Sequence, residues 1–249
     1  MDISVVQQES ALYLQIANKI AADIEQGRLK VGSKIASERA LGEELGVSRM
    51  TVRQALHHLT RRGMLEARVG QGTFITHALI EQKLSTLTGF TEEMARQGHK
   101  SSSIVVVAET RTADHVAETA LKLPQNSLVH RLVRIRLVDG EPVAIETTEV
   151  TALLAPGLLE IADFGKASLY RILRESFDII PTTGEQTMMA TTADAATARS
   201  LDLVEGSPVL KLTRLTFDSN QRPFEFVRSF YRGDSFVMKV DLNLGSESK

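Results

Sequence analysis

The chain has 249 residues, of which 43% are hydrophobic and 24% are charged, so it can form two domains of ordinary size. It contains no cysteine, which excludes disulfide bonds, thiolate metal sites and thiol nucleophiles and suits a cytoplasmic protein. The net charge of −2 is unevenly divided: residues 1–77 hold 10 basic and 8 acidic side chains, whereas residues 78–249 hold 19 and 23. No run of apolar residues approaches the roughly 20 that a membrane span needs.

Three helices are predicted in the first quarter of the chain. The first carries an apolar stripe, because leucine or isoleucine recurs every four positions at Leu12, Ile16, Ile20 and Ile24. Gly27 follows this stripe and ends the helix. Ser37 is a candidate N-cap for a short second helix, and Gly46 makes the turn after it. Ser48 caps the third helix, which stops at Gly63.

The third helix has two distinct faces. At about 100° per residue its apolar positions fall in one narrow arc, formed by Val52, Ala55, Leu56 and Leu59. The opposite face carries Arg49, Met50, Arg53, Gln54 and His57. Short strands near 64–67 and 73–76 then flank a glycine-rich tip and predict a β-ribbon. This order is typical of a winged helix-turn-helix, whose third helix enters the DNA major groove; for the helix taken alone, a solvated face is the alternative.

Residues 78–88 are polar to mixed and are predicted to link this domain to a second one. Beyond them the pattern predicts a strand at 103–108, a helix at 113–121, a hairpin at 127–150, a helix at 167–176, a strand at 183–192, a helix at 193–201, a hairpin at 207–231, a strand near 236–242 and a disordered tail. An internal repeat relates Ala113 to Ala193, Ser127 to Ser207 and Arg134 to Arg214 at an offset of 80, and Pro142 to Pro223 at 81. The repeat predicts a pseudo-symmetric antiparallel sheet with helices on one side.

Residues 11–76 resemble the GntR family of bacterial regulators. The matching stretches are Leu12-Tyr13-Leu14-Gln15-Ile16, Ile24-Glu25-Gln26-Gly27, Ser37-Glu38-Arg39, Gly46-Val47-Ser48-Arg49, Thr51-Val52-Arg53-Gln54-Ala55-Leu56 and Gly70-Gln71-Gly72-Thr73-Phe74. Val31 and Ala36 depart from the family, which usually has prolines there, and lose some loop stiffening. The resemblance implies DNA contacts by Arg39, Arg49, Arg53 and the wing glycine Gly70. Helix N-termini at Ser37, Ser48 and Thr51 can hold phosphates; simple capping is the alternative for the two serines, and both roles can hold at once.

The C-terminal half is similar to the effector-binding domain of the HutC subfamily, which shares its fold with chorismate lyase. The similarity covers roughly 85–243 and is marked by Thr88-Gly89-Phe90-Thr91, Gly140-Glu141-Pro142, Ser168-Leu169-Tyr170 and the strand from Pro223 to Tyr231. We therefore expect an α+β protein with a winged helix-turn-helix at 8–77, a linker at 78–88 and a chorismate-lyase-like, antiparallel-sheet domain at 89–243. A homodimer on a near-palindromic operator follows from the resemblance, because two recognition helices on a two-fold axis match two half-sites.

The strand Leu132–Val138 is the most informative stretch for a ligand. Arg134 and Arg136 share one face with apolar neighbours, so each needs an anion nearby or must face water. A carboxylate of the chain is one partner, and the resemblance favours a ligand anion. A two-residue turn at Asp139-Gly140 would put Glu146 on the opposite face, whereas a three-residue loop brings it to the arginines. We predict the three-residue loop.

The candidate effector site joins these residues to others that the resemblance supplies. Its members are Phe90, Thr91, Arg134, Arg136, Glu146, Ser168, Tyr170, Glu225 and Tyr231. The arginines and the hydroxyls of Thr91, Ser168 and Tyr170 suit a phosphate, and the remaining acids and Tyr231 suit sugar hydroxyls or an amide. A phosphosugar or an amino-sugar phosphate is the first choice, and a carboxylate effector is the alternative.

The function expected is that of a repressor released from its operator by a small anionic effector. A chorismate-lyase-like enzyme is the rival, but the attached DNA-binding domain argues against it. A constitutive architectural protein would leave the paired arginines unexplained. No cofactor is expected, and no metal site, because the adjacent His57 and His58 cannot share one helix face.

Overall fold

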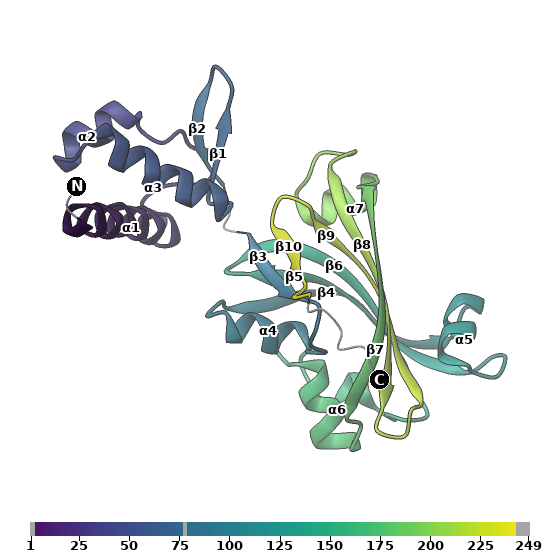
Figure 1. Cartoon of the computed structure of the whole chain (residues 1–249). Coiled ribbons are helices and arrows are strands. Elements are labelled where there is room, and N and C mark those ends of the chain that lie inside the picture. The colour runs from purple at the N-terminus through teal and green to yellow at the C-terminus, as the bar shows by residue number, and fades with distance from the viewer. Residues whose placement is uncertain (1–2, 77–78, 243–249) are drawn as a thin grey trace, which may run out of the picture. The chain divides into compact units, whose positions relative to one another are not determined.

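The computed structural model describes residues 3–76 and 79–242, which form two compact units that divide between Ile80 and Glu81 (Figure 1). The segment 78–88, predicted as a linker, contains a strand, β3 (Ile80–Lys83), which pairs with β10 (Phe236–Lys239). The C-terminal tail predicted to be disordered lies outside the described residues.

The N-terminal unit has three helices and a β-ribbon, as predicted. They are α1 (Ile3–Glu25), α2 (Glu38–Leu45), α3 (Arg49–Arg61), β1 (Leu65–Arg68) and β2 (Gly72–Ile75). The predicted caps are confirmed: the Ser37 side chain accepts a hydrogen bond from the N–H of Ala40, and the Ser48 side chain accepts one from the N–H of Thr51. Gly46 ends α2 with φ +66°, a conformation that glycine adopts without strain.

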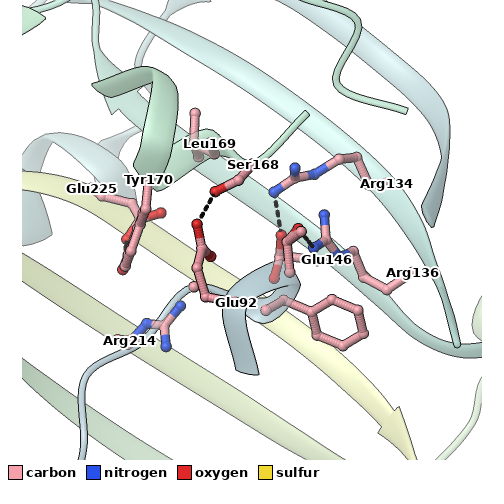
Figure 2. A pocket seen from close by; sticks show the side chains of 12 residues that line it. Glu92, Arg134, Arg136, Glu146, Ser168, Leu169, Tyr170, Arg214 and Glu225 are labelled. Carbon is pink, nitrogen blue, oxygen red and sulfur yellow. Dashed lines mark hydrogen bonds and ion pairs between the residues drawn. The ribbon is translucent and has the colours of Figure 1, made fainter. Parts of the chain in front are cut away.

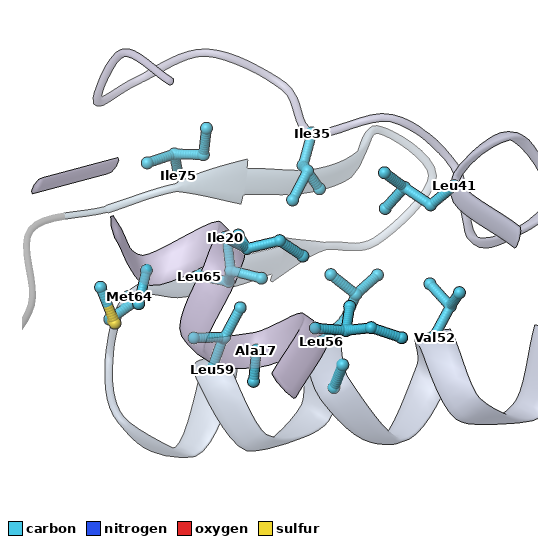
Figure 3. Packing of buried hydrophobic residues seen from close by; sticks show 13 residues of the cluster. Ala17, Ile20, Ile35, Leu41, Val52, Leu56, Leu59, Met64, Leu65 and Ile75 are labelled. Atoms are coloured by element: carbon cyan, nitrogen blue, oxygen red, sulfur yellow. The ribbon is translucent and has the colours of Figure 1, made fainter. Parts of the chain in front are cut away.

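The core of this unit lies between α1, α3 and the ribbon (Figure 3). Side chains from α3 meet α1 and the ribbon there, including Val52, Leu56, Leu59, Ala17, Ile20, Leu65 and Ile75. The four apolar positions predicted to face inwards on α3 are all buried, which fixes the opposite face of the helix towards solvent. In the predicted stripe on α1, Ile16 and Ile20 are buried and Ile24 is partly buried, whereas Leu12 is 37% exposed.

The second unit contains one six-stranded antiparallel sheet with the order β4-β5-β6-β9-β8-β7. Its strands are β4 (Ser101–Thr112), β5 (Leu128–Val138), β6 (Glu141–Thr151), β7 (Pro181–Thr192), β8 (Pro208–Asp218) and β9 (Pro223–Arg232). Its helices are α4 (Phe90–Arg96), α5 (His115–Leu121), η1 (Leu158–Glu160), α6 (Leu169–Phe177) and α7 (Ala195–Leu201). The predicted α+β class and antiparallel sheet are confirmed, although α4, β3 and η1 were not predicted.

Helices cover both faces of this sheet, so the prediction that they lie on one side is wrong. On one face α6 packs through Leu173 against Leu132 and Phe224. On the other face α5 packs against Phe226 and α7 packs near Phe230. Phe224 lies on the first face because it is the extra residue of a β-bulge in β9. The repeat relates these two helix contacts. Helix α5 of the first half packs on β9 of the second half, and α7 of the second half packs on β6 of the first half.

The internal repeat is confirmed by the strand register. The offset of 81 relates Thr147 to Arg228, and these two residues are paired with each other where β6 meets β9. The same offset relates Ala144 to Glu225 and Val150 to Tyr231. The strand pair of Ala144 with Tyr231 therefore corresponds to the strand pair of Glu225 with Val150. The two halves of the sheet are therefore related by a pseudo-two-fold axis between β6 and β9.

The turn between β5 and β6 differs from the prediction. Asp139 and Gly140 form a two-residue turn with φ +52° and +93°, which is typical of a tight hairpin, so the three-residue loop is wrong. However, Val143 is an extra residue in β6, and this β-bulge shifts the register by one. Glu146 consequently pairs with Arg134 and lies on the arginine face. This is the predicted face, but the bulge places Glu146 there and not a three-residue loop.

Candidate functional sites

The exposed face of α3 is the first candidate site. Arg49, Met50, Arg53, Gln54 and His57 all lie on the surface, as predicted. The side chains of Arg49 and Arg53 are 74% and 66% exposed, and they stand one helical turn apart. Two guanidinium groups at this spacing can reach base edges or phosphates when the helix lies in a groove.

Glu38 links the start of α2 to this face. Its carboxylate oxygens lie 2.9 Å from Nε of Arg49 and 3.9 Å from Nε of Arg53. Arg39, also exposed, lies 3.4 Å from Glu43 one turn along α2. Exposed ion pairs of this kind contribute at most about 1 kcal/mol, so the arginines are free to exchange a carboxylate for a phosphate or a base.

The helix starts and the wing place the remaining predicted residues. Ser37 and Ser48 are N-caps, whereas the Thr51 side chain is only 5% exposed and its hydroxyl lies 2.7 Å from that of Ser48. Thr51 therefore supports the start of α3 and does not present a free hydroxyl. At the wing tip Gly70 has φ +74°, and the N–H of Gln71 donates to the carbonyl of Arg68, which makes a type II turn that requires glycine at this position.

The second candidate site is a pocket between the N-terminal ends of α4 and α6 and the sheet (Figure 2). It gathers eight of the nine predicted effector residues: Phe90, Thr91, Arg134, Arg136, Glu146, Ser168, Tyr170 and Glu225. Tyr231 does not line this pocket; it lines two small adjoining cavities together with Arg214. Burial raises the pKa of Tyr231 to about 12, so its hydroxyl stays protonated and can donate a hydrogen bond.

The two predicted arginines have different partners. Arg134 is buried and donates to Glu146 at 2.6 Å, so a carboxylate of the chain neutralises it. Arg136 is 3% exposed and, among the described residues, has no carboxylate within 4 Å. It lies 4.3 Å from the centre of the Phe90 ring and 3.4 Å from the Thr91 hydroxyl, and its Nε has no partner. Burial and Arg134 lower the pKa of Arg136 to about 10, so it remains cationic at neutral pH.

The two buried glutamates titrate in opposite directions. Burial alone would raise the pKa of Glu146, but the surrounding arginines outweigh burial and lower it to about 2. Burial raises the pKa of Glu225, against the opposing effect of Arg214. Glu225 accepts hydrogen bonds from Tyr170 at 2.8 Å and Thr216 at 2.7 Å. The pocket thus holds a fixed ion pair, an unpaired buried cation and a hydrogen-bonded acid.

Two charged residues of the pocket were not predicted, Glu92 and Arg214. The repeat contained the signal for Arg214, because it is the counterpart of Arg134 at an offset of 80 and therefore faces the same side of the sheet. Glu92 accepts a hydrogen bond from Ser168, which also caps α6 by accepting from the N–H of Arg171. No spacing in the sequence marks Glu92, because α4 was not predicted.

The volume of the pocket is about 20 Å³, which is room for little more than a water molecule. A ligand of the size of a sugar therefore requires α4 or its side chains to move. Along the chain α4 follows β3 and the segment 84–89.

Two family models match the chain. The model described as bacterial regulatory proteins, gntR family, matches residues 12–75, and the UTRA domain model matches residues 96–237. The HTH-type transcriptional repressor NagR of Bacillus subtilis is 34% identical over 227 residues, which cover 91% of this chain and 92% of the relative. The chain belongs to the GntR family.

Two further similarities place this GntR regulator in the HutC subfamily. The histidine utilization repressor of Pseudomonas putida is 30% identical and covers 89% of this chain and 88% of its own. The crystal structure of PhnF from Mycobacterium smegmatis superposes with a TM-score of 0.78 at 31% identity, over 94% of this chain and all of PhnF. These relatives are named as repressors or share their fold, so the protein is a DNA-binding transcription regulator with an effector-binding domain and not an enzyme.

Two other findings concern the described residues alone. None of the helices within 3–76 and 79–242 is long and apolar enough to cross a membrane. Over the same ranges, no three histidine or acidic side chains come together in a way that could hold a metal ion.

Proposed function

We propose that this protein is a cytoplasmic repressor that binds a near-palindromic operator as a homodimer and is released by a small anionic effector. Arg39, Arg49 and Arg53 contact the DNA, the wing at Gly70 enters the minor groove, and Ser37 and Ser48 orient phosphates at the helix starts. The exposed arginines on α3, held by weak surface pairs, support this assignment.

The observation that carries the effector assignment is the buried Arg136. A guanidinium that is 3% exposed and has no carboxylate within 4 Å among the described residues is costly unless an anion completes its environment. A phosphate would also accept from Thr91 and Ser168, which line the same pocket. Glu146, Glu225 and Tyr231 then lie where hydroxyls or an amide of the ligand can bind. A phosphosugar or an amino-sugar phosphate is therefore the first choice, and a carboxylate effector is second.

Release of the operator follows from the closed state of the pocket. The effector binds only the arrangement in which α4 has moved away from Arg136 and Ser168. It therefore stabilises that arrangement and alters the path of residues 78–88 towards the DNA-binding unit. The DNA-binding units of the two protomers then no longer fit the spacing of the half-sites. This coupling requires the effector to bind the two arrangements with different affinity.

Fluorescence anisotropy with labelled operator DNA tests the proposal. Glucosamine 6-phosphate and glucose 6-phosphate are expected to lower DNA affinity at least tenfold, whereas urocanate tests the carboxylate alternative. Arg136→Met should abolish the response and leave DNA binding without ligand intact. Arg131→Met is the matched control, because Arg131 lies on the same strand but faces the other side, 3.3 Å from Glu109. Unchanged DNA binding with every ligand would remove the mechanism.

A further inference from the structure

Arg214 is a third cation at the effector pocket. It reaches the pocket from β8, at the position that the repeat relates to Arg134 on β5. Arg214 lacks the carboxylate partner that Arg134 has. Glu146 pairs with Arg134 across the strands, whereas the equivalent residue that pairs with Arg214 is Val227. Among the described residues no carboxylate lies within 4 Å of Arg214, and its Nε is buried without a hydrogen-bond partner. The first half of the sheet thus gives its arginine a direct carboxylate partner, and the second half does not.

A larger cavity begins at Arg214. It has a volume of about 300 Å³ and lies between the segment 82–88 and β7, with Arg214 in its lining. Its other lining side chains are mainly hydroxyls and amides, such as Ser85, Thr183 and Gln186. Gln82 lines it too, and its Oε1 is buried without a partner. A volume of this size is sufficient for a ligand substituent, whereas the pocket beside Arg136 is not.

The two arginine sites are far enough apart to hold opposite ends of one ligand. Arg134 and Arg214 lie on β5 and β8, which are separated by β6 and β9. Three strand spacings and an offset of two residues along the strands place their Cα atoms about 16 Å apart, and both side chains line the same pocket (Figure 2). The two guanidinium groups therefore reach this pocket from different strands, as the two ends of one ligand would require.

The chemistry of the second end is that of a carboxylate. Arg214 and Lys83 both line the larger cavity, and the planar guanidinium edge of Arg214, with its free Nε–H, matches a carboxylate in a bidentate arrangement. Burial acts to lower the pKa of Arg214, but the tyrosine and acidic neighbours outweigh it and raise the pKa, so the group is always charged.

We propose that Arg214 binds a carboxylate at the end of the effector opposite to its phosphate. The effector is then a phosphorylated sugar acid, or a phosphorylated sugar joined to a carboxylate-bearing group, and not a simple sugar phosphate. This inference rests on the proposed function, because it assumes a phosphate beside Arg136, and it narrows the class of ligand.

A matched pair of ligands tests the second site. Gluconate 6-phosphate and glucitol 6-phosphate differ only in a carboxylate that replaces a CH₂OH group at the far end. Isothermal titration calorimetry on the full chain should give at least tenfold tighter binding of the gluconate compound. Arg214→Met should remove this preference, so that the variant binds the two compounds with affinities within about threefold of each other. Lys211→Met is the control, because this substitution removes one positive charge from the opposite face of the same strand.

The outcomes separate this inference from the proposed function. Equal affinities of the wild-type protein for the two compounds, or a preference that survives Arg214→Met, would overturn the carboxylate site while leaving the phosphate site standing. Failure of both compounds and of glucosamine 6-phosphate to bind would overturn the proposed effector class, and the second site with it. Circular dichroism and the melting temperature establish that each variant is folded.

Discussion

Glu146 on β6 lies opposite Arg134 on β5, with Oε1 2.6 Å from Nη2. This pairing arises because the bulge at Val143 shifts by one residue the strand register that the tight turn sets. Without the extra residue every side chain of β6 beyond the turn would face the other side of the sheet. The second hairpin has its bulge at Phe224, the equivalent position of the repeat, and there it brings Glu225 opposite Thr216. The two bulges therefore decide which acids the pocket contains.

Glu146→Gln is expected to destabilise the effector-binding domain by about 3 kcal/mol, because Arg134 is left buried without its counter-charge. Urea unfolding of the full chain, followed by circular dichroism, measures the change. Glu109→Gln is the control, because it breaks an exposed pair with Arg131 and should cost less than about 1 kcal/mol. Equal losses in the two variants would contradict the assignment of a buried, mutually dependent pair.

The same pair predicts a pH dependence of stability. The folded protein lowers the pKa of Glu146 from its ordinary value of 4.5 to about 2, so its stabilising effect is complete above about pH 4.5 and is lost as the pH falls towards 2. Glu225 has the opposite sign, because burial raises its pKa and its protonation favours the folded state. The difference in unfolding free energy between wild type and Glu146→Gln isolates the first group. This difference should shrink between pH 4.5 and 2, and a constant difference would argue against the ion pair.

Arg53→Ala is expected to weaken operator binding by about 10- to 100-fold, because the side chain lies on the exposed face of α3, where the proposed function has it contact a base or a phosphate. If the contact is to a phosphate, the slope of log affinity against log salt falls by about one. Lys19→Ala, which removes an exposed charge from α1, is the control for net charge. Unchanged affinity and an unchanged salt slope for Arg53→Ala would contradict the proposed recognition surface.

Val31→Pro is expected to stabilise the DNA-binding unit by about 0.4–1 kcal/mol. Residues 30–33 form a turn in which Ser33 donates to the carbonyl of Lys30 and Gly32 has φ +81°, so Val31 occupies the position that favours proline in a type II turn. The N–H of Val31 makes no backbone hydrogen bond to any described residue. Thermal unfolding measures the gain, and Val31→Ala, which lacks the ring, should not reproduce it. A loss of stability would show that this turn cannot accept the ring.

Ser168→Ala is expected to cost about 1 kcal/mol of stability through the lost cap of α6 and to weaken effector binding about tenfold. Asp194→Ala is a matched control, because Asp194 caps α7 by accepting from the N–H of Thr197 but lies outside the pocket lining. Calorimetric titration with glucosamine 6-phosphate should distinguish the two variants, whereas their melting temperatures should fall alike. Similar effector affinities would limit Ser168 to a capping role.

The helical half of the fold could be predicted from local patterns, and the pocket only in part. Caps such as Ser48 and stops such as Gly46 act within one turn, so their effect is visible in the sequence. The short helix α4 has seven residues and no side-chain cap at Gly89, and it therefore left no comparable pattern. Glu92 was missed with it. The bulge at Val143 could not be predicted, because it depends on packing across the sheet.

The repeat has a consequence for how a ligand is oriented. The two halves supply equivalent positions around the pocket, yet Arg136 on one side is matched by Thr216 on the other, and Glu146 by Val227. A symmetric molecule would find its two ends in unlike surroundings and gain nothing from its symmetry. The two ends of the pocket are chemically different, so a compound with two different termini is expected to bind in one orientation only.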